Sequence, residues 1–298
     1  MPELPEVEVL VRHLAPLVRG RGISAVEIRR PRVLGPTPAP EFIRTLEGAT
    51  FTGLLRRGKY LVFSLRPPDR SAEPIMLVGH LGMTGRMYLL PRAAELPKHA
   101  AVVLELGRQH RFVYEDPRYF GRLTLDRTGL DRLGPEPLAD DFTPAVLAAG
   151  LRRSAQAVKI KLLDQSLVAG VGNIYASEAL FQAGVSPRLA ARRLKAPQID
   201  RLHAAIREVL TTAIAAGSTL PLDFSGQAAK TSAIVEAPAP VRGALFYYGT
   251  AGPDSPFYQE RLQVYDRRGE PCVRCAAPIR RLIQAARSTF FCPRCQRA

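Results

Sequence analysis

The four cysteines of the chain lie near its C-terminal end with the spacing of a metal site. Cys272 and Cys275 form one pair, Cys292 and Cys295 form another, and sixteen residues separate the pairs. Two residues between cysteines let both thiolates of a pair reach one ion, and two pairs complete a tetrahedral four-thiolate shell. The spacing therefore predicts one structural zinc ion with no open position for catalysis. Four buried or redox-active thiols are the alternative interpretation.

Basic residues dominate both the cysteine segment and the whole chain. Residues 267–298 hold eight arginines and one acidic residue, Glu270, and the 298-residue chain has 42 Lys and Arg against 27 Asp and Glu. The formal net charge is +15 and the pI is near 10.2. Solubility needs far less charge, so the composition favours a polyanionic partner, nucleic acid above all. With 46% hydrophobic residues, the chain is expected to fold around a core.

The N-terminus, Met1-Pro2-Glu3, is a second candidate for chemistry. Removal of the initiator methionine, which is normal before a small residue, would leave Pro2 with a free secondary amine. An α-amino group has a pKa of roughly 8, so part of it is neutral near pH 7. Attack of this amine on a sugar C1′ gives an iminium without an N–H, an electron sink for elimination, and Glu3 could act as general acid. A processing signal at Pro2, and helix-start acids at Glu3 and Glu6, are the alternatives.

The N-terminal half is predicted to be mainly β-structure after one helix, in which Val7, Leu10, Val11 and Leu14 recur with helical spacing. Runs typical of strands follow at residues 22–28, 49–55, 60–65 and 75–78, and the runs 101–106 and 111–115 indicate a hairpin. Several short strands separated by turn residues favour a sandwich or barrel. The loop-like stretch 127–141 is the predicted domain boundary.

The C-terminal half is predicted to be helical, because the hydrophobic period changes. Helices are expected at 157–167 and 174–181, with a turn at 168–173 between them. A longer helix carries one apolar stripe that ends before Gly217 and consists of Ile199, Leu202, Ile206, Val209, Leu210 and Ala213. Residues 221–256 are rich in Pro, Ala, Gly and Ser and are expected to form a long loop.

Motifs along the whole chain resemble those of the formamidopyrimidine-DNA glycosylases. The opening residues 2–8, PELPEVE, are similar to the N-terminal signature of that family. The resemblance continues in the family's order with RGKY at 57–60, HLGMTG at 80–85, KH at 98–99, DPRYFG at 116–121, GVGNIYASE at 170–178 and the four cysteines. Chance does not produce so many spaced motifs in one order.

This resemblance implies an α+β multidomain protein of base excision repair. The family fold is an N-terminal two-layer antiparallel β-sandwich with flanking helices, joined to a helical domain with a helix-two-turn-helix and a four-cysteine zinc finger. The implied limits are 1–130 for the catalytic sandwich, 142–230 for the helix-two-turn-helix domain, 231–262 for an extended lesion-capping loop and 263–298 for the finger. The implied activity is excision of 8-oxoguanine and formamidopyrimidines from duplex DNA, followed by β,δ-elimination at the abasic site.

The family's catalytic residues match positions in this chain. The resemblance implies that Pro2 is the Schiff-base nucleophile and Glu3 the acid that protonates the sugar ring oxygen, with Glu6 supporting the N-terminal geometry. Lys59 matches the lysine that contacts the lesion or its phosphate and assists elimination. By composition alone, a basic turn before a strand is the favoured interpretation of Lys59. Arg287 matches the finger arginine linked to δ-elimination.

Other matches concern the DNA itself. Met83, Arg118 and Phe120 match three side chains that fill the stack when the target nucleotide leaves it. A thioether and a phenyl ring replace lost stacking, while a guanidinium can hydrogen-bond the orphaned cytosine. The residues matched to phosphate contacts are His99, Lys159, Asn173 and Arg287. For Asn173, capping of a helix is an alternative that is compatible with phosphate binding.

The chain departs from the family pattern at two places. Ser154 lies where the family often has a DNA-contacting lysine, and Arg152 or Arg153 could supply that contact instead. The segment 232–251 is an insertion relative to the family's loop over the extruded base, and we expect it to alter the choice of lesion.

Two other functions stay open on the sequence. One is a glycosylase of the endonuclease VIII type, which prefers oxidised pyrimidines, and the other is a zinc-ribbon protein that binds damaged DNA without chemistry. The sequence shows no secretory signal and no apolar run of the roughly 18 residues that a membrane span needs. We therefore expect a cytoplasmic monomer whose partner is double-stranded DNA with oxidised purines or abasic sites.

Overall fold

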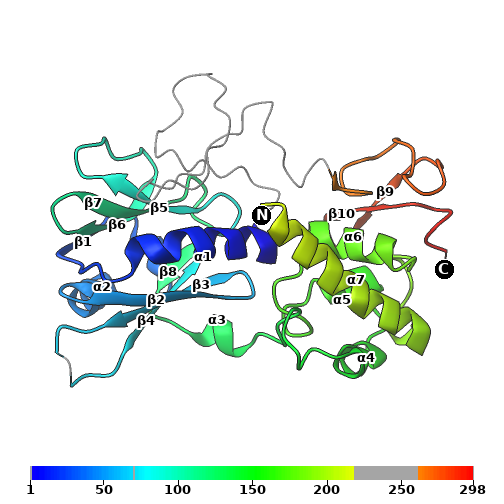
Figure 1. Cartoon of the computed structure of the whole chain (residues 1–298), viewed down its shortest axis with the longest axis horizontal. Coiled ribbons are helices and arrows are strands. Elements are labelled where there is room, and N and C mark those ends of the chain that lie inside the picture. The colour runs from blue at the N-terminus through cyan, green and yellow to red at the C-terminus, as the bar shows by residue number, and fades with distance from the viewer. Residues whose placement is uncertain (1, 70, 218–260, 298) are drawn as a thin grey trace. The chain divides into compact units, whose positions relative to one another are not determined.

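The structure, a computed structural model, describes residues 2–69, 71–217 and 261–297 (Figure 1). Within these residues the chain divides into two compact units, one of residues 2 and 6–131 and the other of residues 3–5, 132–217 and 261–297. The expected lesion-capping loop at 231–262 lies outside the described residues except for its last two positions. The insertion at 232–251 lies wholly outside them.

The first unit is a two-layer antiparallel sandwich, as predicted, and its two sheets form separate layers in Figure 1. One sheet has the order β1-β6-β7-β5 and consists of β1 (Ala25–Ile28), β5 (Arg86–Pro91), β6 (Ala100–Leu106) and β7 (His110–Glu115). The other has the order β2-β3-β4-β8 and consists of β2 (Thr50–Arg57), β3 (Tyr60–Arg66), β4 (Ile75–His80) and β8 (Arg122–Thr124).

A common aromatic core joins the two sheets. The rings of Phe51 and Phe63 in the second sheet lie 6.4 and 5.5 Å, between centroids, from the ring of Phe112 in the first. The predicted hairpin of β6 and β7 is confirmed. The run predicted from residue 22 begins as a strand only at Ala25, and β5 and β8 escaped prediction because their patterns are short or interrupted.

The helix α1 (Leu4–Val18) packs its predicted apolar residues into the same core as the phenylalanines. Three short helical elements of this unit were not predicted: η1 (Pro31–Leu34), α2 (Ala39–Leu46) and α3 (Thr128–Asp131). The helix α2 buries only Phe42 and Leu46, too few positions for a period to be visible in the sequence. The helix α3 lies in the stretch 127–141 that was expected to be a loop.

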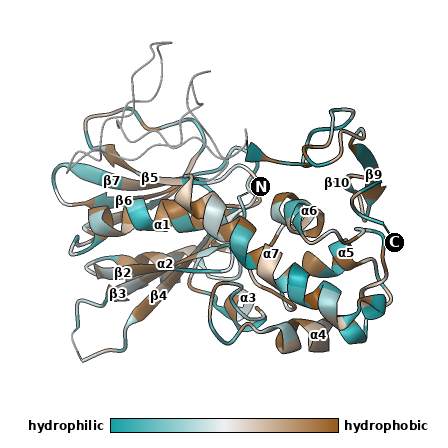
Figure 2. Ribbon diagram, turned by 45° about the vertical axis from the view of Figure 1, so that its right-hand side comes forward, coloured by the Kyte–Doolittle hydropathy of each residue, from teal (hydrophilic) through white to brown (hydrophobic). Residues whose placement is uncertain are grey.

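The second unit is helical. Its elements are α4 (Pro144–Arg152), α5 (Val158–Leu162), α6 (Asn173–Gln182), η2 (Ala191–Arg193) and α7 (Ala196–Ala215). The predicted stripe of α7 is buried, and hydrophilic and hydrophobic residues alternate along this helix in Figure 2. The prediction of one helix over 157–167 is wrong, because α5 ends at Leu162. Asp164 instead accepts the backbone N–H and hydroxyl of Ser166, a local turn that competes with the helix.

A small antiparallel hairpin closes the described chain. Its strands are β9 (Arg280–Gln284) and β10 (Arg287–Phe291), and their connecting residues Ala285 and Ala286 both have positive φ. Ile279 and Phe290 of this segment share a hydrophobic cluster with Phe181 of α6. The hairpin is therefore packed on the helix that follows the GVG turn.

Candidate active site and zinc centre

The four cysteine sulfur atoms form a compact cluster. All four Sγ atoms lie within 4.8 Å of one another, with Cys272 and Cys295 3.9 Å apart and Cys275 and Cys292 3.4 Å apart. A tetrahedral zinc site with Zn–S bonds of about 2.3 Å separates its sulfurs by roughly 3.8 Å. The cluster therefore fits one zinc ion held by four thiolates. In that arrangement the metal is structural, because no coordination position remains for a substrate.

Glu3 is bound to the N-terminus of α6. Its carboxylate accepts the backbone N–H of Ile174 at 2.9 Å and that of Tyr175 at 3.4 Å, and the side chain is buried. The next residue, Leu4, donates its N–H to the carbonyl of Gly170 at 3.1 Å. The first N–H groups of a helix have no partner within the helix and carry partial positive charge. A carboxylate at this place is therefore stabilised in its charged form.

Two glycines of the GVGN motif make room for these N-terminal residues. A Cβ on Gly172 would overlap the carboxylate atoms of Glu3, and a Cβ on Gly170 would lie 2.6 Å from the side chain of Leu4. Gly170 also has a φ of +85°, which disfavours any side chain. Only glycine permits this approach, so the motif is a cradle for residues 3 and 4.

Asn173 does not cap the helix that follows the GVG turn. Gly172 is the residue before the helix and Asn173 is already the first helical residue, so the alternative of a capping Asn173 is wrong. The N–H groups that were expected to receive a phosphate at this terminus instead bind the carboxylate of Glu3. The side-chain amide of Asn173 donates to the carbonyl of Ser288 at 3.0 Å.

Lys159 is buried and joins three elements. Its ammonium donates to Asn173 Oδ1 at 2.5 Å, to the carbonyl of Ser288 at 2.8 Å and to Thr289 Oγ1 at 2.8 Å. These partners belong to α6 and β10, while Lys159 itself belongs to α5. An ammonium has three N–H groups, so all of them are used inside the protein. The structure thus gives Lys159 the geometry of an internal brace between α5, α6 and β10.

Burial and two neighbouring charges act on the pKa of Lys159 in opposite directions. Burial lowers its pKa to about 8, the nearby carboxylate of Glu3 opposes this change, and the guanidinium of Arg287 adds to it. Arg287 itself is exposed at the start of β10, and Arg153 is exposed directly after α4. Both arginine side chains are accessible to solvent.

Lys59 lies in the first unit, in the tight turn between β2 and β3. Arg57 pairs with Tyr60, so Gly58 and Lys59 alone form the turn, and Gly58 has the positive φ that such turns demand. Lys59 is only 6% exposed. Pro2 and Glu6 of the same unit are buried, and His99 is half-buried before β6.

His80 is a neighbour of Lys59 that the sequence did not single out for a role. Its ring lies 4.8 Å from that of Tyr60, and its Nδ1 accepts the N–H of Gly82 at 3.0 Å. Burial, with the charges of Lys59 and Arg122, lowers the pKa of His80 to about 4. The ring is therefore neutral at physiological pH, and Nδ1 is free to act as an acceptor.

Met83, Arg118 and Phe120 are exposed on two loops of the first unit. Met83 is 46% and Phe120 51% exposed, although both are large apolar residues, and Arg118 is exposed with them. The guanidinium carbon of Arg118 lies 4.7 Å from the centroid of the Phe120 ring. All three side chains are therefore accessible to a partner.

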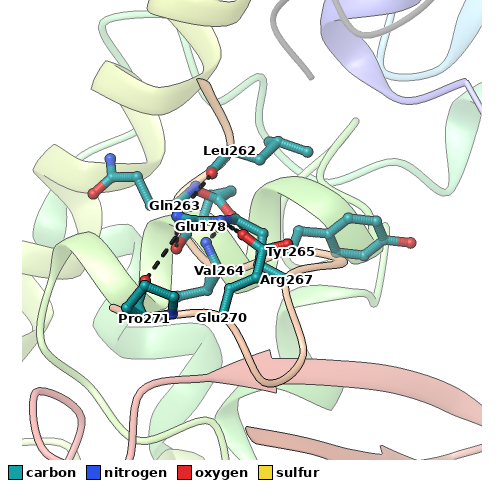
Figure 3. Close-up of polar contacts among 8 residues, drawn as sticks. All are labelled: Glu178, Leu262, Gln263, Val264, Tyr265, Arg267, Glu270 and Pro271. Atoms are coloured by element: carbon teal, nitrogen blue, oxygen red, sulfur yellow. Dashed lines mark hydrogen bonds and ion pairs between the residues drawn. The ribbon is translucent and has the colours of Figure 1, made fainter. Parts of the chain in front are cut away.

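Glu178 was quoted only as part of a motif, and the structure gives it a clear role. Its buried carboxylate accepts three consecutive backbone N–H groups, of Gln263, Val264 and Tyr265, at 2.8 to 3.0 Å (Figure 3). Arg267 lies beside it and donates to Glu270 at 2.7 Å. Glu178 thereby ties α6 to the segment that leads into the zinc finger.

Comparison with known proteins finds one family along the whole chain. Three family models match: the formamidopyrimidine-DNA glycosylase N-terminal domain at residues 1–123, the formamidopyrimidine-DNA glycosylase H2TH domain at 133–223, and the zinc finger found in FPG and IleRS at 269–298. A formamidopyrimidine-DNA glycosylase from Symbiobacterium thermophilum is 43% identical over 305 residues, covering 99% of this chain and 89% of the relative.

Solved structures agree with this result. A mutant of the Lactococcus lactis FPG in complex with DNA containing Fapy-dG has a TM-score of 0.81 and 32% identity, with 100% of both chains covered. The wild-type Lactococcus lactis FPG in complex with DNA containing an oxidised pyrimidine has a TM-score of 0.80 and 32% identity, again with 100% of both chains covered. Among the described residues, no helix is long and apolar enough to cross a membrane.

The cradle predicts a specific cost for a methyl group at position 172. Gly172→Ala should lower the free energy of unfolding by about 2–4 kcal/mol, because the new Cβ displaces the Glu3 carboxylate from its N–H partners. Gly53→Ala is the matched control, since its Cβ would meet only Ser64 at 4.0 Å. Urea unfolding measures both. When Glu3 is also replaced by alanine, Gly172→Ala should lower the free energy of unfolding far less. An equal loss in that background would show that the new Cβ clashes with a group other than Glu3.

The neutral state of His80 predicts acid sensitivity. Its pKa is about 4 in the folded protein against 6.5 for a free ring, so the unfolded chain binds the proton first as the pH falls. Stability should therefore decrease between pH 6.5 and pH 4, by about 3 kcal/mol from this group. Urea unfolding of the wild type and His80→Gln across this range measures the difference in slope. Identical slopes would contradict the assignment.

The cysteine cluster predicts one zinc ion per chain. Because the four cysteines would tie both ends of the finger to one ion, removal of the metal by a chelator should unfold β9 and β10 while the sandwich persists. Metal analysis gives the stoichiometry, and amide hydrogen exchange reports the hairpin. Cys292→Ser should behave as the metal-free protein does. A hairpin that keeps its protection without metal would argue against a structural zinc.

Proposed function

Since this chain belongs to the formamidopyrimidine-DNA glycosylase family, we propose that it is a base excision repair enzyme that removes oxidised purines from duplex DNA and then cleaves the strand. The substrates are 8-oxoguanine and formamidopyrimidines, and the second reaction is that of an abasic-site lyase. The observation that carries the proposal is that the carboxylate of Glu3, the residue next to Pro2, is hydrogen-bonded to the first backbone N–H groups of α6.

The reaction begins at the nitrogen of Pro2 after removal of Met1. The neutral amine attacks C1′ of the damaged nucleotide, the bond from C1′ to the base breaks, and the base leaves as an anion that takes a proton from water. Opening of the sugar ring then gives an iminium between Pro2 and C1′, with the ring oxygen protonated. Loss of the proton at C2′ expels the 3′ phosphate, and a second elimination expels the 5′ phosphate.

Glu3 supplies the proton in this scheme. Its carboxylate is held in the charged form by two backbone N–H groups, so it enters the reaction as a base. It takes the proton that the Pro2 ammonium must lose and returns it to the sugar ring oxygen. Glu6, buried one helical turn later in α1, supports the position of these residues.

Lys59 and Arg287 act through charge. Lys59 is a nearly buried cation in a tight turn, where it stabilises the anion that develops during elimination. Arg287 is exposed beside the brace of Lys159 and assists the second elimination at the 5′ phosphate. The zinc ion is structural and holds the fold of the finger that carries Arg287.

DNA is held and opened by separate groups. We assign phosphate contacts to His99, Arg153, Lys159, Asn173 and Arg287. Lys159 also supports Asn173 and β10 from inside. Met83, Arg118 and Phe120 enter the gap that the extruded nucleotide leaves, as their exposure allows. The domain limits 1–130, 142–230, 231–262 and 263–298 are retained as part of this proposal. All of these groups belong to one chain, so a monomer suffices, acting on genomic DNA in the cytoplasm.

Oxidised pyrimidines are a second candidate substrate class. The specific observation in their favour is that the similar Lactococcus lactis FPG has been solved with DNA containing an oxidised pyrimidine. Excision of 8-oxoguanine and of thymine glycol from otherwise identical duplexes separates the two classes. Faster release of 8-oxoguanine supports the proposal, and faster release of thymine glycol supports the alternative.

The decisive experiment is reductive trapping. Borohydride added during reaction with an 8-oxoguanine duplex should join the processed protein covalently to DNA through Pro2, because it reduces the iminium. The same chain with Met1 retained is the matched control, since its Pro2 nitrogen is an amide and cannot attack. Glu3→Gln should reduce base release by roughly two to four orders of magnitude through loss of the proton carrier. Processed protein that binds the duplex without trapping would support a binding protein without chemistry.

A further inference from the structure

Two loops of the first unit carry the three exposed side chains that the proposed function assigns to the gap in the DNA. The loop 81–85 between β4 and β5 carries Met83, and the loop 116–121 between β7 and β8 carries Arg118 and Phe120. Strand pairing holds the two loops side by side at their ends, since β4 pairs with β8 as far as His80 and Arg122, and β5 with β7 as far as Arg86 and Glu115. The tips lie beyond these pairs, so other contacts must hold them together.

A single buried carboxylate binds both loops. Asp116 is fully buried, and its Oδ1 accepts the hydroxyl of Thr84 at 2.6 Å and the N–H of Arg118 at 3.1 Å. Its Oδ2 accepts the N–H of Gly121 at 2.8 Å and the hydroxyl of Tyr114 at 3.3 Å. Thr84 is the residue after Met83, while the other partners belong to β7 and its loop. Asp116 thus connects the two loops directly.

The backbones of the loops are also in contact. A Cβ on Gly82, which has a φ of +59°, would lie 2.5 Å from the nitrogen of Gly121 and 2.6 Å from the carbonyl carbon of Phe120. A Cβ on Gly121 would overlap the carbonyl oxygen of His80. The ring of His80 in turn accepts the N–H of Gly82. Neither loop can move far without the other.

The exposed tip is arranged before DNA binds. Tyr119 has a φ of +53°, a conformation that L residues rarely adopt, and its hydroxyl accepts the Nε–H of Arg30 at 3.1 Å. On either side of it, Arg118 stacks on Phe120. Ordering flexible side chains during binding costs free energy, and a tip that is already ordered avoids part of that cost.

We propose that Asp116 is a positioning residue that makes Met83, Arg118 and Phe120 fill the gap in the DNA as one rigid unit. This inference rests on the proposed function, because it names what holds the gap-filling side chains. Asp116 is fully buried beneath the loops, so it acts through them and not as a catalytic residue. Loss of an Asp116 contact should therefore slow reactions on duplex DNA, where a gap must be filled. It should slow reactions on single-stranded DNA much less, because that DNA has no base stack to fill.

The test compares two substrates and a pair of variants at Thr84. Thr84→Val removes the hydroxyl that Asp116 accepts and keeps the shape, whereas Thr84→Ser keeps the hydroxyl. Excision of 8-oxoguanine from a duplex requires gap filling, and cleavage of a single-stranded oligonucleotide with an abasic site does not. Thr84→Val should lower excision about tenfold, a loss of one hydrogen bond to a charged group, and single-strand cleavage much less. Thr84→Ser should restore the ratio of the two rates.

Asp116→Asn extends the series, because an amide nitrogen cannot accept the bonds of one carboxylate oxygen. It should lower the ratio of excision to single-strand cleavage by ten- to a hundredfold. Glu115→Gln is its matched control, a buried neighbour whose carboxylate accepts from Tyr88 on β5 and not from either loop. If Asp116→Asn does not fold, the Thr84 pair still decides. A fluorescent base analogue opposite the lesion reports gap filling independently of chemistry.

The outcomes separate this inference from the proposed function. Active wild-type protein together with an unchanged ratio in Thr84→Val, or a ratio that Thr84→Ser does not restore, would overturn the role of Asp116. A wild-type protein that traps no DNA and releases no base would overturn the proposed function itself. We expect Thr84→Val and Asp116→Asn to lower the ratio of duplex excision to single-strand cleavage and to weaken the fluorescence change. Glu115→Gln should leave both the ratio and the fluorescence change as in the wild type.

Discussion

The contact between the Glu3 carboxylate and the first N–H groups of α6 is the constraint from which the proposed chemistry follows. A buried carboxylate needs partners, and the end of a helix offers unpaired donors with the right charge. This contact fixes the residue next to Pro2, and through the peptide bond it restricts Pro2 as well. It also explains why the glycines at 170 and 172 precede this helix, because a side chain at either place would occupy the space of residues 3 and 4. The N-terminal motif and the GVGN motif at 170–173 lie far apart in the sequence, and they therefore form one structural arrangement at the start of α6.

The same principle recurs wherever the protein has to present groups to a large polyanion. Surfaces that bind DNA must be exposed to solvent, so they cannot be ordered by a hydrophobic core of their own. In this chain, buried charged side chains order the exposed segments by hydrogen bonds. Asp116 binds the loops of the first unit, Lys159 binds β10, and Glu178 binds the segment that enters the finger. Each is bound by a group of another segment: Asp116 by the hydroxyl of Thr84, Lys159 by the carbonyl of Ser288, and Glu178 by backbone N–H groups of residues 263–265. Leaving such a charge without partners is expensive, so each contact holds its segment in one position.

Prediction from the sequence worked where a pattern is long or chemically unusual. The apolar stripe of α7 spans many turns, the hairpin of β6 and β7 has two clear strands, and two cysteine pairs at this spacing are typical of zinc sites. It failed where an element is short, as for α2, β5 and β8, because a few residues do not establish a period. The helix expected to continue to residue 167 stops at Leu162, because the side chain of Asp164 bonds to the following backbone instead.

What the sequence alone determined was the set of groups available for chemistry: a proline at position 2 followed by a glutamate, an excess of basic residues, and two cysteine pairs able to share an ion. These follow from residue identity and short spacing, which folding does not alter. The tertiary structure decided which of these groups face solvent and which are used internally. Lys159 and Arg153 are both basic residues, yet the first is enclosed by Asn173 and β10 while the second is exposed after α4. That difference depends on partners far away along the chain, and no local pattern contains them.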